Sequence, residues 1–472
     1  MRPDVDVAII GAGVVGCAVT RALTQLGLQT ALIEKSGDIL EGASKGNSAI
    51  LHTGFDAPAG SIELDCVRRG YALYEQLHRS FNLPLLRSGA LVVAWDETQE
   101  AQLQDILTKA HNNGSTDTEI IGREKLFAME PHLSKKARAA VHVPGESLID
   151  PWSAPLAYLR HAMLNGAKLV LNSEVLGAHF DGKQWSLKLP DQSLTASIVV
   201  NTAGLFGDRV EGFNRPSPFE IHPRKGQFVV FDKAASSLAN AILLPVPTPV
   251  TKGVVVCRTV FGNLLVGPTA DEQFSRTDAS VHKTTLDTLI DEGDRIIPGL
   301  KNYGVSACYA GIRPATQYKD YQLEAVPERN WITVGGIRST GLTAALGIGE
   351  KVAEIYREHF EDRENGIPFF NPVAESDACV PNLCEYKKRP WQARHNGIVC
   401  HCEMVTRKEI EEALSKEPAA KTPGGLKRRT RAMMGRCQGF YCSWKVAEIT
   451  EGKLSPSLSA MPDGTAKEGK SS

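Results

Sequence analysis

Hydrophobic and polar positions follow distinct patterns at the start of the chain. Residues 5–10 form a short apolar run rich in β-branched side chains, which is typical of a buried parallel strand. Apolar residues spaced three or four apart over residues 15–26 predict a helix that stops at Gly27, and a second apolar run follows at residues 30–33. The pattern predicts a strand–helix–strand unit of an α/β domain.

Strand and helix patterns continue to about residue 358, with one interruption. Residues 226–268 are rich in Val, Leu, Thr and Pro, which suggests the antiparallel strands of a second domain. We therefore expect an α/β dinucleotide-binding domain interrupted by a substrate domain. Strands are predicted at residues 91–94, 168–171, 198–204 and 331–336, and helices at residues 97–111, 152–165 and 341–358.

Length and composition narrow the class of protein. A chain of 472 residues has room for about three domains of roughly 150 residues each. A net charge of −1 gives no reason to expect nucleic acid or an anionic membrane as the main partner. The first strand begins at Val5 and no apolar run reaches about 18 residues, so we expect neither a signal peptide nor a membrane span. Ten cysteines in so long a chain favour a reducing, cytoplasmic setting over a disulfide framework.

The turn between the first strand and the first helix has the spacing of a dinucleotide-binding fingerprint. Gly11 allows the tight turn, Gly13 lets the backbone approach a pyrophosphate, and Gly16 lets the helix pack on the strand. The pyrophosphate would lie at the helix N-terminus, where free N–H groups favour an anion. Glu34 ends the second strand and is placed to accept a hydrogen bond from a ribose hydroxyl. The alternative is a glycine-rich turn in an ordinary βαβ unit.

Four cysteines near the C-terminus form two closely spaced pairs. Cys400 and Cys402 make the first pair, and Cys437 and Cys442 the second, which supplies the four thiolates that a [2Fe–2S] cluster takes. Zinc ribbons usually use C-x2-C pairs, so the tighter first pair favours the cluster, with structural zinc and unliganded thiols as alternatives. The negative charge of a cluster would be offset by the basic residues Lys427, Arg428, Arg429, Arg431 and Arg436.

Several dispersed motifs resemble the D-amino-acid-oxidase-type flavoproteins. Besides the fingerprint, they are residues 47–55, 266–269, 310–314 and 336–342. Within this superfamily the chain is most similar to glycerol-3-phosphate oxidases and dehydrogenases and to their L-2-hydroxyglutarate-oxidising relatives. Its four-cysteine segment resembles the bacterioferritin-associated-ferredoxin-like [2Fe–2S] domain of anaerobic glycerol-3-phosphate dehydrogenases.

The resemblance implies an α/β fold with an FAD-binding Rossmann-like domain, interleaved with an antiparallel-sheet substrate domain and followed by a small helical [2Fe–2S] domain. The FAD-binding domain is expected at residues 1–90, 145–215 and 328–360, the substrate domain at 91–144 and 216–327, a linker at 361–396, the [2Fe–2S] domain at 397–450 and a disordered tail at 453–472.

The resemblance also implies residues around the flavin. FAD would extend past the fingerprint towards Ser48 and His52, and Gly204 would lie where another strand end meets the cofactor. The helix that begins at Gly341 would direct its N-terminal dipole at the flavin pyrimidine edge. His52 is expected to be the base that takes the hydroxyl proton when an alcohol is oxidised. A histidine that only packs or contacts the flavin is the alternative.

Three more residues match substrate or flavin positions of these relatives. Arg313 matches a substrate arginine, suited to the bidentate binding of phosphate or carboxylate, and Ser339 matches a serine beside the flavin. Lys252 matches a lysine of the glycerol-3-phosphate oxidases and favours glycerol 3-phosphate, although a solvated loop lysine is the alternative. Thr340 stands where many relatives have proline, and an L-2-hydroxy acid or an amino acid is the alternative substrate.

Two cofactors in one chain imply an electron route. Two electrons would reach the flavin and leave singly through the cluster, which favours a dehydrogenase over an oxidase. The acceptor would be a partner protein or a quinone-reducing partner, so that a cytoplasmic chain could lie at the inner membrane through that partner. A further alternative is an electron-transfer subunit whose catalytic partner is another chain.

Overall fold

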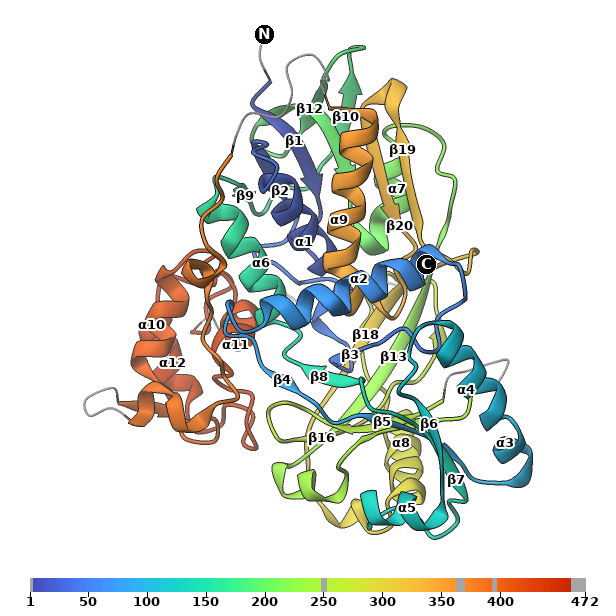
Figure 1. Cartoon of the computed structure of the whole chain (residues 1–472). Coiled ribbons are helices and arrows are strands. Elements are labelled where there is room, and N and C mark those ends of the chain that lie inside the picture. Colours follow the sequence, from blue (N-terminus) through green and yellow to red (C-terminus); the bar gives the residue numbers. More distant parts are fainter. Residues whose placement is uncertain (1–2, 248–252, 362–369, 393–396, 460–472) are drawn as a thin grey trace, which may run out of the picture. The chain divides into compact units, whose positions relative to one another are not determined.

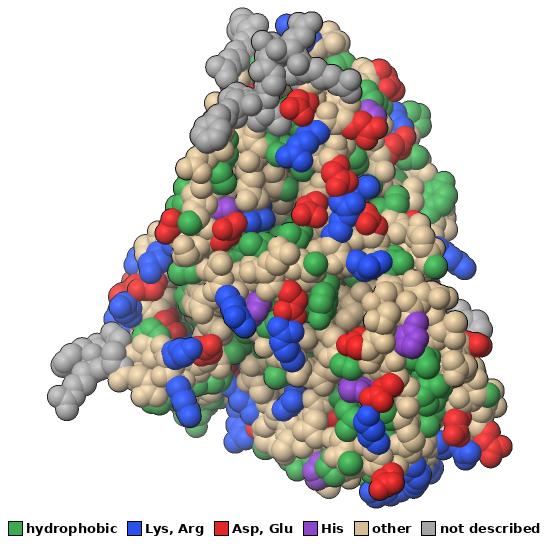
Figure 2. Space-filling view, in the orientation of Figure 1, with side chains coloured by type: hydrophobic (Ala, Val, Ile, Leu, Met, Phe, Trp, Pro, Cys, Tyr) green, Lys and Arg blue, Asp and Glu red, His purple; other side chains and the backbone are tan. Residues whose placement is uncertain are grey.

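The chain consists of two compact units, Met1–Cys384 and Glu385–Ser472 (Figure 1). The structure is a computed structural model and describes residues 3–247, 253–361, 370–392 and 397–459. Within these ranges, no helix has both the length and the apolar character needed to cross a membrane. Acidic and basic side chains are interspersed over the face shown in Figure 2, in keeping with the small net charge.

A mainly parallel sheet forms the core of the first unit. β1 (Val5–Ile10) pairs in parallel with β2 (Thr30–Ile33) on one side and with β12 (Ser193–Asn201) on the other. β20 (Trp331–Gly335) continues the parallel run beside the end of β12. These strands confirm the α/β pattern predicted from the sequence. The sheet is completed by β9 (Lys168–Val170), β10 (Gly177–Phe180), β11 (Trp185–Lys188) and β19 (Gln322–Val326).

Helices of this unit pack closely on one another because glycines stand at their contacts. α9 (Gly341–His359) packs against both α1 (Val14–Thr24) and α2 (Ile62–Leu77), and Figure 1 shows α2 crossing α9. A Cβ atom on Gly70 of α2 would overlap the carbonyl oxygen of Thr343, so the backbones of the two helices touch. This crossing fixes the first turns of α9. The sheet's remaining helices are α6 (Ser153–Leu164) and α7 (Gly207–Glu211).

The second sheet of this unit is largely antiparallel, as expected for the substrate domain, although β14 and β5 are parallel neighbours. The expected segment 216–327 is too long, because β19 pairs with β20 in the first sheet. The strands are β5 (Ala90–Ala94), β6 (Glu119–Gly122), β7 (Ala139–Val143), β13 (Ile221–Phe231), β14 (Ile242–Pro245), β15 (Val255–Arg258), β16 (Leu264–Gly267), β17 (Asp271–Glu272) and β18 (Val305–Thr316), with α3 (Glu97–Ala101), α4 (Leu103–Asn112), α5 (Arg123–Met129) and α8 (Lys283–Ile296).

The described part of the expected linker packs on the first unit. Val380 is buried in the main core, and the Asn82 side chain donates to its carbonyl oxygen at 3.0 Å. Glu375 forms an ion pair of 3.1 Å with Arg21 of α1. Residues 370–384 therefore belong to the first unit, because they bury apolar side chains and pair charges with it.

The second unit is small and mostly helical. Its elements are β21 (Ile398–Cys400), β22 (Val405–Thr406), α10 (Arg407–Ser415), α11 (Pro423–Thr430) and α12 (Ser443–Thr450).

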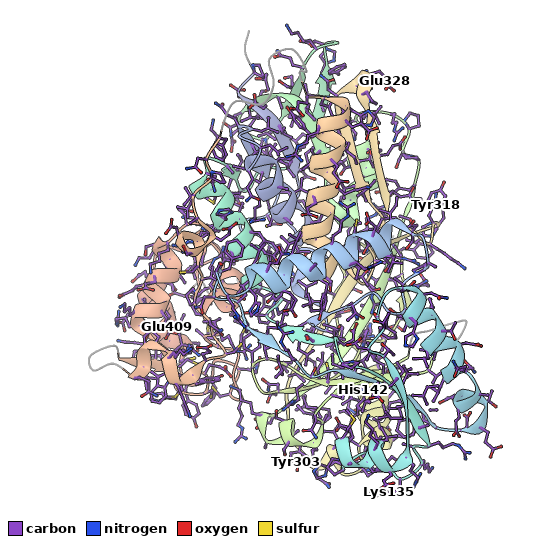
Figure 3. All side chains as sticks on the ribbon, viewed as in Figure 1. Lys135, His142, Tyr303, Tyr318, Glu328 and Glu409 are labelled. Atoms are coloured by element: carbon purple, nitrogen blue, oxygen red, sulfur yellow. The ribbon has the colours of Figure 1, made fainter. Side chains whose placement is uncertain are left out.

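A buried ion pair anchors the start of α10. Thr406 caps this helix in a capping box with Glu409, which Figure 3 labels, and Glu409 pairs with the buried Arg389 at 2.8 Å. Disorder was expected from residue 453, but Leu454 is buried in the core of this unit and the Ser455 N–H donates to the Lys421 carbonyl oxygen. The packed chain thus continues past residue 450.

Candidate functional site

The glycine-rich turn after β1 has the geometry that a dinucleotide site needs. Gly11 has a φ of +105°, a conformation that other residues rarely adopt, and a Cβ atom on Gly16 would overlap the Gly11 carbonyl oxygen. The end of β12 closes on the same turn, because the Thr202 hydroxyl donates to the Ile10 carbonyl oxygen at 2.9 Å. Gly204, two residues later, has a φ of +55°, and its contact with the cofactor stays a prediction.

Glu34 and Ser44 hold the backbone around this turn. The buried Glu34 carboxylate accepts hydrogen bonds from the Ala12 N–H at 2.8 Å and the Ser36 N–H at 2.9 Å. A carboxylate accepts about four hydrogen bonds, so capacity for a ribose hydroxyl remains. The Ser44 hydroxyl accepts from the Val14 N–H at 3.0 Å, at the first turn of α1. Ser44 therefore stands at this helix N-terminus. Ser48 lies four residues later in the same loop, and its place beside the flavin stays a prediction.

His52 forms a pair with a buried carboxylate that sequence patterns did not indicate. β3 (Ile50–Leu51) and β8 (Ser147–Ile149) pair antiparallel with Leu51 opposite Ser147, so the register places His52 opposite Glu146. The His52 Nδ1 atom lies 2.9 Å from the Glu146 carboxylate. Glu146 is fully buried and also accepts from the Thr53 N–H at 2.6 Å. Because the carboxylate accepts at Nδ1, Nε2 is the proton-accepting nitrogen of the neutral ring.

The N-terminus of α9 lies against the same histidine. The His52 N–H donates to the Thr343 hydroxyl at 3.0 Å, within the first turn of α9. The Thr340 side chain does not cap this helix; it bonds with buried Glu63 at 2.6 Å. The turn that begins at Gly341 is therefore free to direct its N–H groups at an anionic ligand. Ser339 is exposed just before it.

Arg313 projects from the paired strands β13 and β18 where glycines make room for it. A Cβ atom on Gly226 would lie 2.8 Å from the Arg313 guanidinium and 2.9 Å from the Cβ atom of Pro268, so a larger residue there would crowd Arg313. Gly311 is two residues from Arg313 on the same face of β18, and its backbone touches that of Gly46. Arg313 thus shares a face with the loop that leads from Ser44 to His52.

The Arg313 guanidinium has no acidic partner among the described residues. Its contacts are two long ones, of 3.4 Å, to the Thr269 carbonyl oxygen. Burial lowers the pKa of Arg313 to about 10, and the nearby Arg224 acts in the same direction, so the group is still charged at neutral pH. The Asp271 carboxylate acts in the opposite direction but forms no ion pair with Arg313. A half-buried cation with no ion pair among the described residues is suited to an anionic ligand. Lys252, the other predicted cation, lies outside the described residues.

The four predicted cysteine ligands interact in two pairs in the second unit. Cys402 contacts Cys437, and Cys400 contacts Cys442, through their sulfur atoms. No three potential ligands among the described residues converge tightly enough to hold a single metal ion. Two neighbouring thiol pairs fit a [2Fe–2S] cluster, which takes four thiolates.

Backbone N–H groups surround these sulfurs. The N–H of Tyr441 donates to Cys437, as do those of Gly439 and Phe440, and they lower the pKa of this thiol. Burial and the Cys400 thiol raise the pKa of Cys442 to about 12, against the effect of a bond from the Met433 N–H. Amide donors to sulfur are the usual surroundings of an iron–sulfur centre, so the loop fits a cluster of thiolates.

The basic residues near the cysteines serve the fold as well as the charge balance. Arg431 forms a buried ion pair of 2.8 Å with Glu403, and Arg429 donates to the carbonyl oxygens of Pro418 and Gly425. Arg431 therefore offsets a neighbouring carboxylate, which weakens the prediction that its charge is reserved for the cluster. Arg436 is exposed beside Cys437.

Comparison with known proteins identifies both units. Residues 6–355 match the family described as FAD dependent oxidoreductase. The chain belongs to this family. Residues 398–451 of the oxidoreductase match the BFD-like [2Fe-2S] binding domain, so its cofactors are FAD and a [2Fe–2S] cluster. The glycine turn and the amide-lined sulfurs fit these two groups.

Relatives along nearly the whole length of the oxidoreductase act on glycerol 3-phosphate. It is 33% identical to the glycerol 3-phosphate dehydrogenase of Caloramator mitchellensis, over 95% of this chain and 94% of that protein. It is 23% identical to one of the subunits of the anaerobic glycerol-3-phosphate dehydrogenase of Escherichia coli K12, over 94% of this chain and 88% of that protein. The FAD-bound L-alpha-glycerophosphate oxidase of Mycoplasma pneumoniae superposes with a TM-score of 0.70 at 26% identity, over 75% of this chain and 94% of the other.

Proposed function

We propose that this oxidoreductase is a dehydrogenase that oxidises glycerol 3-phosphate to dihydroxyacetone phosphate and passes the electrons through its [2Fe–2S] cluster to an external acceptor. The observation that carries the proposal is Arg313, a half-buried cation without an acidic partner among the described residues, on the face that also holds the loop to His52. The glycerol 3-phosphate relatives support this choice of anion.

His52, Glu146 and Arg313 have different roles in the proposed reaction. Oxidation of the C2 alcohol releases the hydroxyl proton and a C–H hydrogen with its electron pair. Bound FAD supplies the acceptor for that electron pair, and the cluster supplies a one-electron path onward. His52 accepts the proton at Nε2, and Glu146 holds the ring through Nδ1 and stabilises the positive charge. Arg313 binds the phosphate and so positions the substrate.

A 2-hydroxy acid is the second candidate substrate. The oxidoreductase is 26% identical to the L-2-hydroxyglutarate dehydrogenase of Indibacter alkaliphilus over 58% of this chain and 69% of that protein. The Arg313 guanidinium would suit a carboxylate as well as a phosphate.

Anaerobic reduction of the bound flavin tests the substrate directly. The purified chain, loaded with FAD and cluster, is mixed with glycerol 3-phosphate or with L-2-hydroxyglutarate, and the flavin absorbance is followed. We expect rapid bleaching by glycerol 3-phosphate alone. Bleaching by the hydroxy acid alone would transfer the assignment to that substrate, and bleaching by neither would overturn both.

Replacing Glu146 by glutamine should slow flavin reduction by about 100-fold, within the usual range for loss of general-base catalysis. A glutamine amide can donate to Nδ1, which moves the ring proton to Nε2 and removes the base. Stopped-flow reduction at saturating substrate measures the effect. The matched control is Glu130→Gln, another buried glutamate, which follows α5 and accepts the backbone N–H groups of Asn240 and Ala241. Unchanged reduction in Glu146→Gln would exclude this role.

A further inference from the structure

Three large aromatic side chains are exposed on the segment that carries the second cysteine pair. Phe440 is 79% exposed, Tyr441 72% and Trp444 66%, and we call these three residues the aromatic patch. Phe440 and Tyr441 lie between Cys437 and Cys442 in the chain. Neighbouring exposed aromatic residues mark interaction surfaces, because a monomer gains nothing from leaving them in water.

The patch has no evident role in the fold of the second unit. The apolar side chains that build the core here are Cys442, Val446 and Ile449, which α12 turns inward. The backbones of Phe440 and Tyr441 hold the Cys437 sulfur through their N–H groups, whereas their side chains extend into solvent. The rings contact each other edge to face, with centroids 5.1 Å apart. The backbone thus serves the cluster, and the rings are available to a partner.

The charge around the patch indicates the kind of partner. No aspartate or glutamate occurs between Glu417 and Glu448, a stretch that contains the second cysteine pair and the two aromatic residues between them. Exposed Arg436 precedes Cys437, and the Lys445 ammonium lies 5.1 Å from the centre of the Trp444 ring. Of the basic residues in this stretch, Lys421 and Arg436 are exposed and Lys427 and Lys445 are partly exposed. Lys445 also pairs with Glu448 at 2.8 Å, and Arg428, Arg429 and Arg431 are buried, so the surface charge rests mainly on Lys421, Lys427 and Arg436.

We infer that the aromatic patch is the docking surface for a separate, acidic one-electron carrier protein. Aromatic side chains bordered by basic residues complement an acidic surface with an apolar centre. Because Cys402 is exposed and Cys437 half-buried, a carrier seated on Phe440 comes directly against the cluster ligands. The inference rests on the proposed function only for the source of electrons. Each substrate molecule oxidised yields two electrons and two protons, so two carrier molecules are reduced by one electron each.

Single-turnover electron transfer tests this surface without relying on the substrate. The full chain with both cofactors is reduced by dithionite, freed of excess reductant and mixed with one of three acceptors. They are the acidic haem domain of cytochrome b5, the basic cytochrome c, and the small dye dichlorophenolindophenol. We expect faster reduction of the acidic cytochrome than of the basic one, and a rate that falls as ionic strength rises.

Paired substitutions in the patch should separate docking from cluster integrity. In Phe440→Ser/Trp444→Ser, we expect reduction of cytochrome b5 to slow by at least about tenfold, with the cluster spectrum and the dye reaction unchanged. The matched control is Phe274→Ser, since Phe274 is fully exposed on the first unit. Wild-type rates in the patch variant, a preference for the basic cytochrome, or no cytochrome reduction at all would overturn the inference. Loss of the dye reaction and the spectrum would make the patch structural and overturn it too. Failure of the proposed function would appear differently, as absent reduction by glycerol 3-phosphate with these transfers intact.

Discussion

Arg313→Ala should lower kcat/KM for glycerol 3-phosphate by about 100- to 1000-fold. Removing one partner of a buried ion pair costs about 3–5 kcal/mol, and 1.36 kcal/mol corresponds to a factor of ten. We take the lower part of that range because Arg313 is half-buried and water can partly replace it. The measurement is the rate of flavin reduction against substrate concentration.

Two controls separate the charge of Arg313 from its packing. Arg224 lies opposite Arg313 on the paired strand but is half-exposed and already bonded to Glu272, so Arg224→Ala should change kcat/KM by no more than about threefold. Glycerol without the phosphate should be an equally poor substrate for wild type and Arg313→Ala, because neither can use the missing anion. An equal loss with glycerol, or near-normal use of glycerol 3-phosphate, would remove Arg313 from the substrate site.

The local parts of the fold followed from the sequence because short-range patterns determine them. The strand at residues 5–10 and the turn at Gly11 lie where apolar periodicity and glycine spacing put them. The placement of β19 could not be read in this way. Its residues follow the long strand β18, and its pairing with β20 depends on contacts that no local pattern records.

The candidate site likewise contains residues that motifs located and one residue that depends on long-range contacts. Motif resemblance located His52 and Arg313, whose roles remain proposals, but it did not find Glu146, which is 94 positions from His52 in the sequence. One signal was present: Glu146 is an acidic residue between the apolar runs that form β7 and β8. A charged side chain between two buried strands is buried only with a partner. The register of β3 against β8 places His52 opposite Glu146 as that partner.

Replacing Cys437 by serine should abolish the visible absorption of the cluster while FAD stays bound. Three backbone N–H groups lower the pKa of the Cys437 thiol, so this is the cysteine that the loop best prepares to bind as a thiolate. A serine hydroxyl does not ionise there, and three thiolates would remain for a cluster that takes four. Visible spectra, iron and sulfide content, and bound FAD are measured on the same preparation.

The Cys437→Ser variant tests the two halves of the proposed electron route separately, namely flavin reduction and electron transfer to a carrier. Flavin reduction by glycerol 3-phosphate should keep its wild-type rate, since the first unit has its own core and its own dinucleotide turn, whereas transfer to a protein carrier should be lost. Cys379→Ser is the matched control, because Cys379 is exposed and lies in the first unit. Unchanged absorption in Cys437→Ser, or stoichiometric zinc in the wild type, would show that the cysteine pairs do not carry electrons. Loss of flavin reduction would instead mean that the active site depends on an intact cluster unit. The two halves of the electron route could then not be treated as independent.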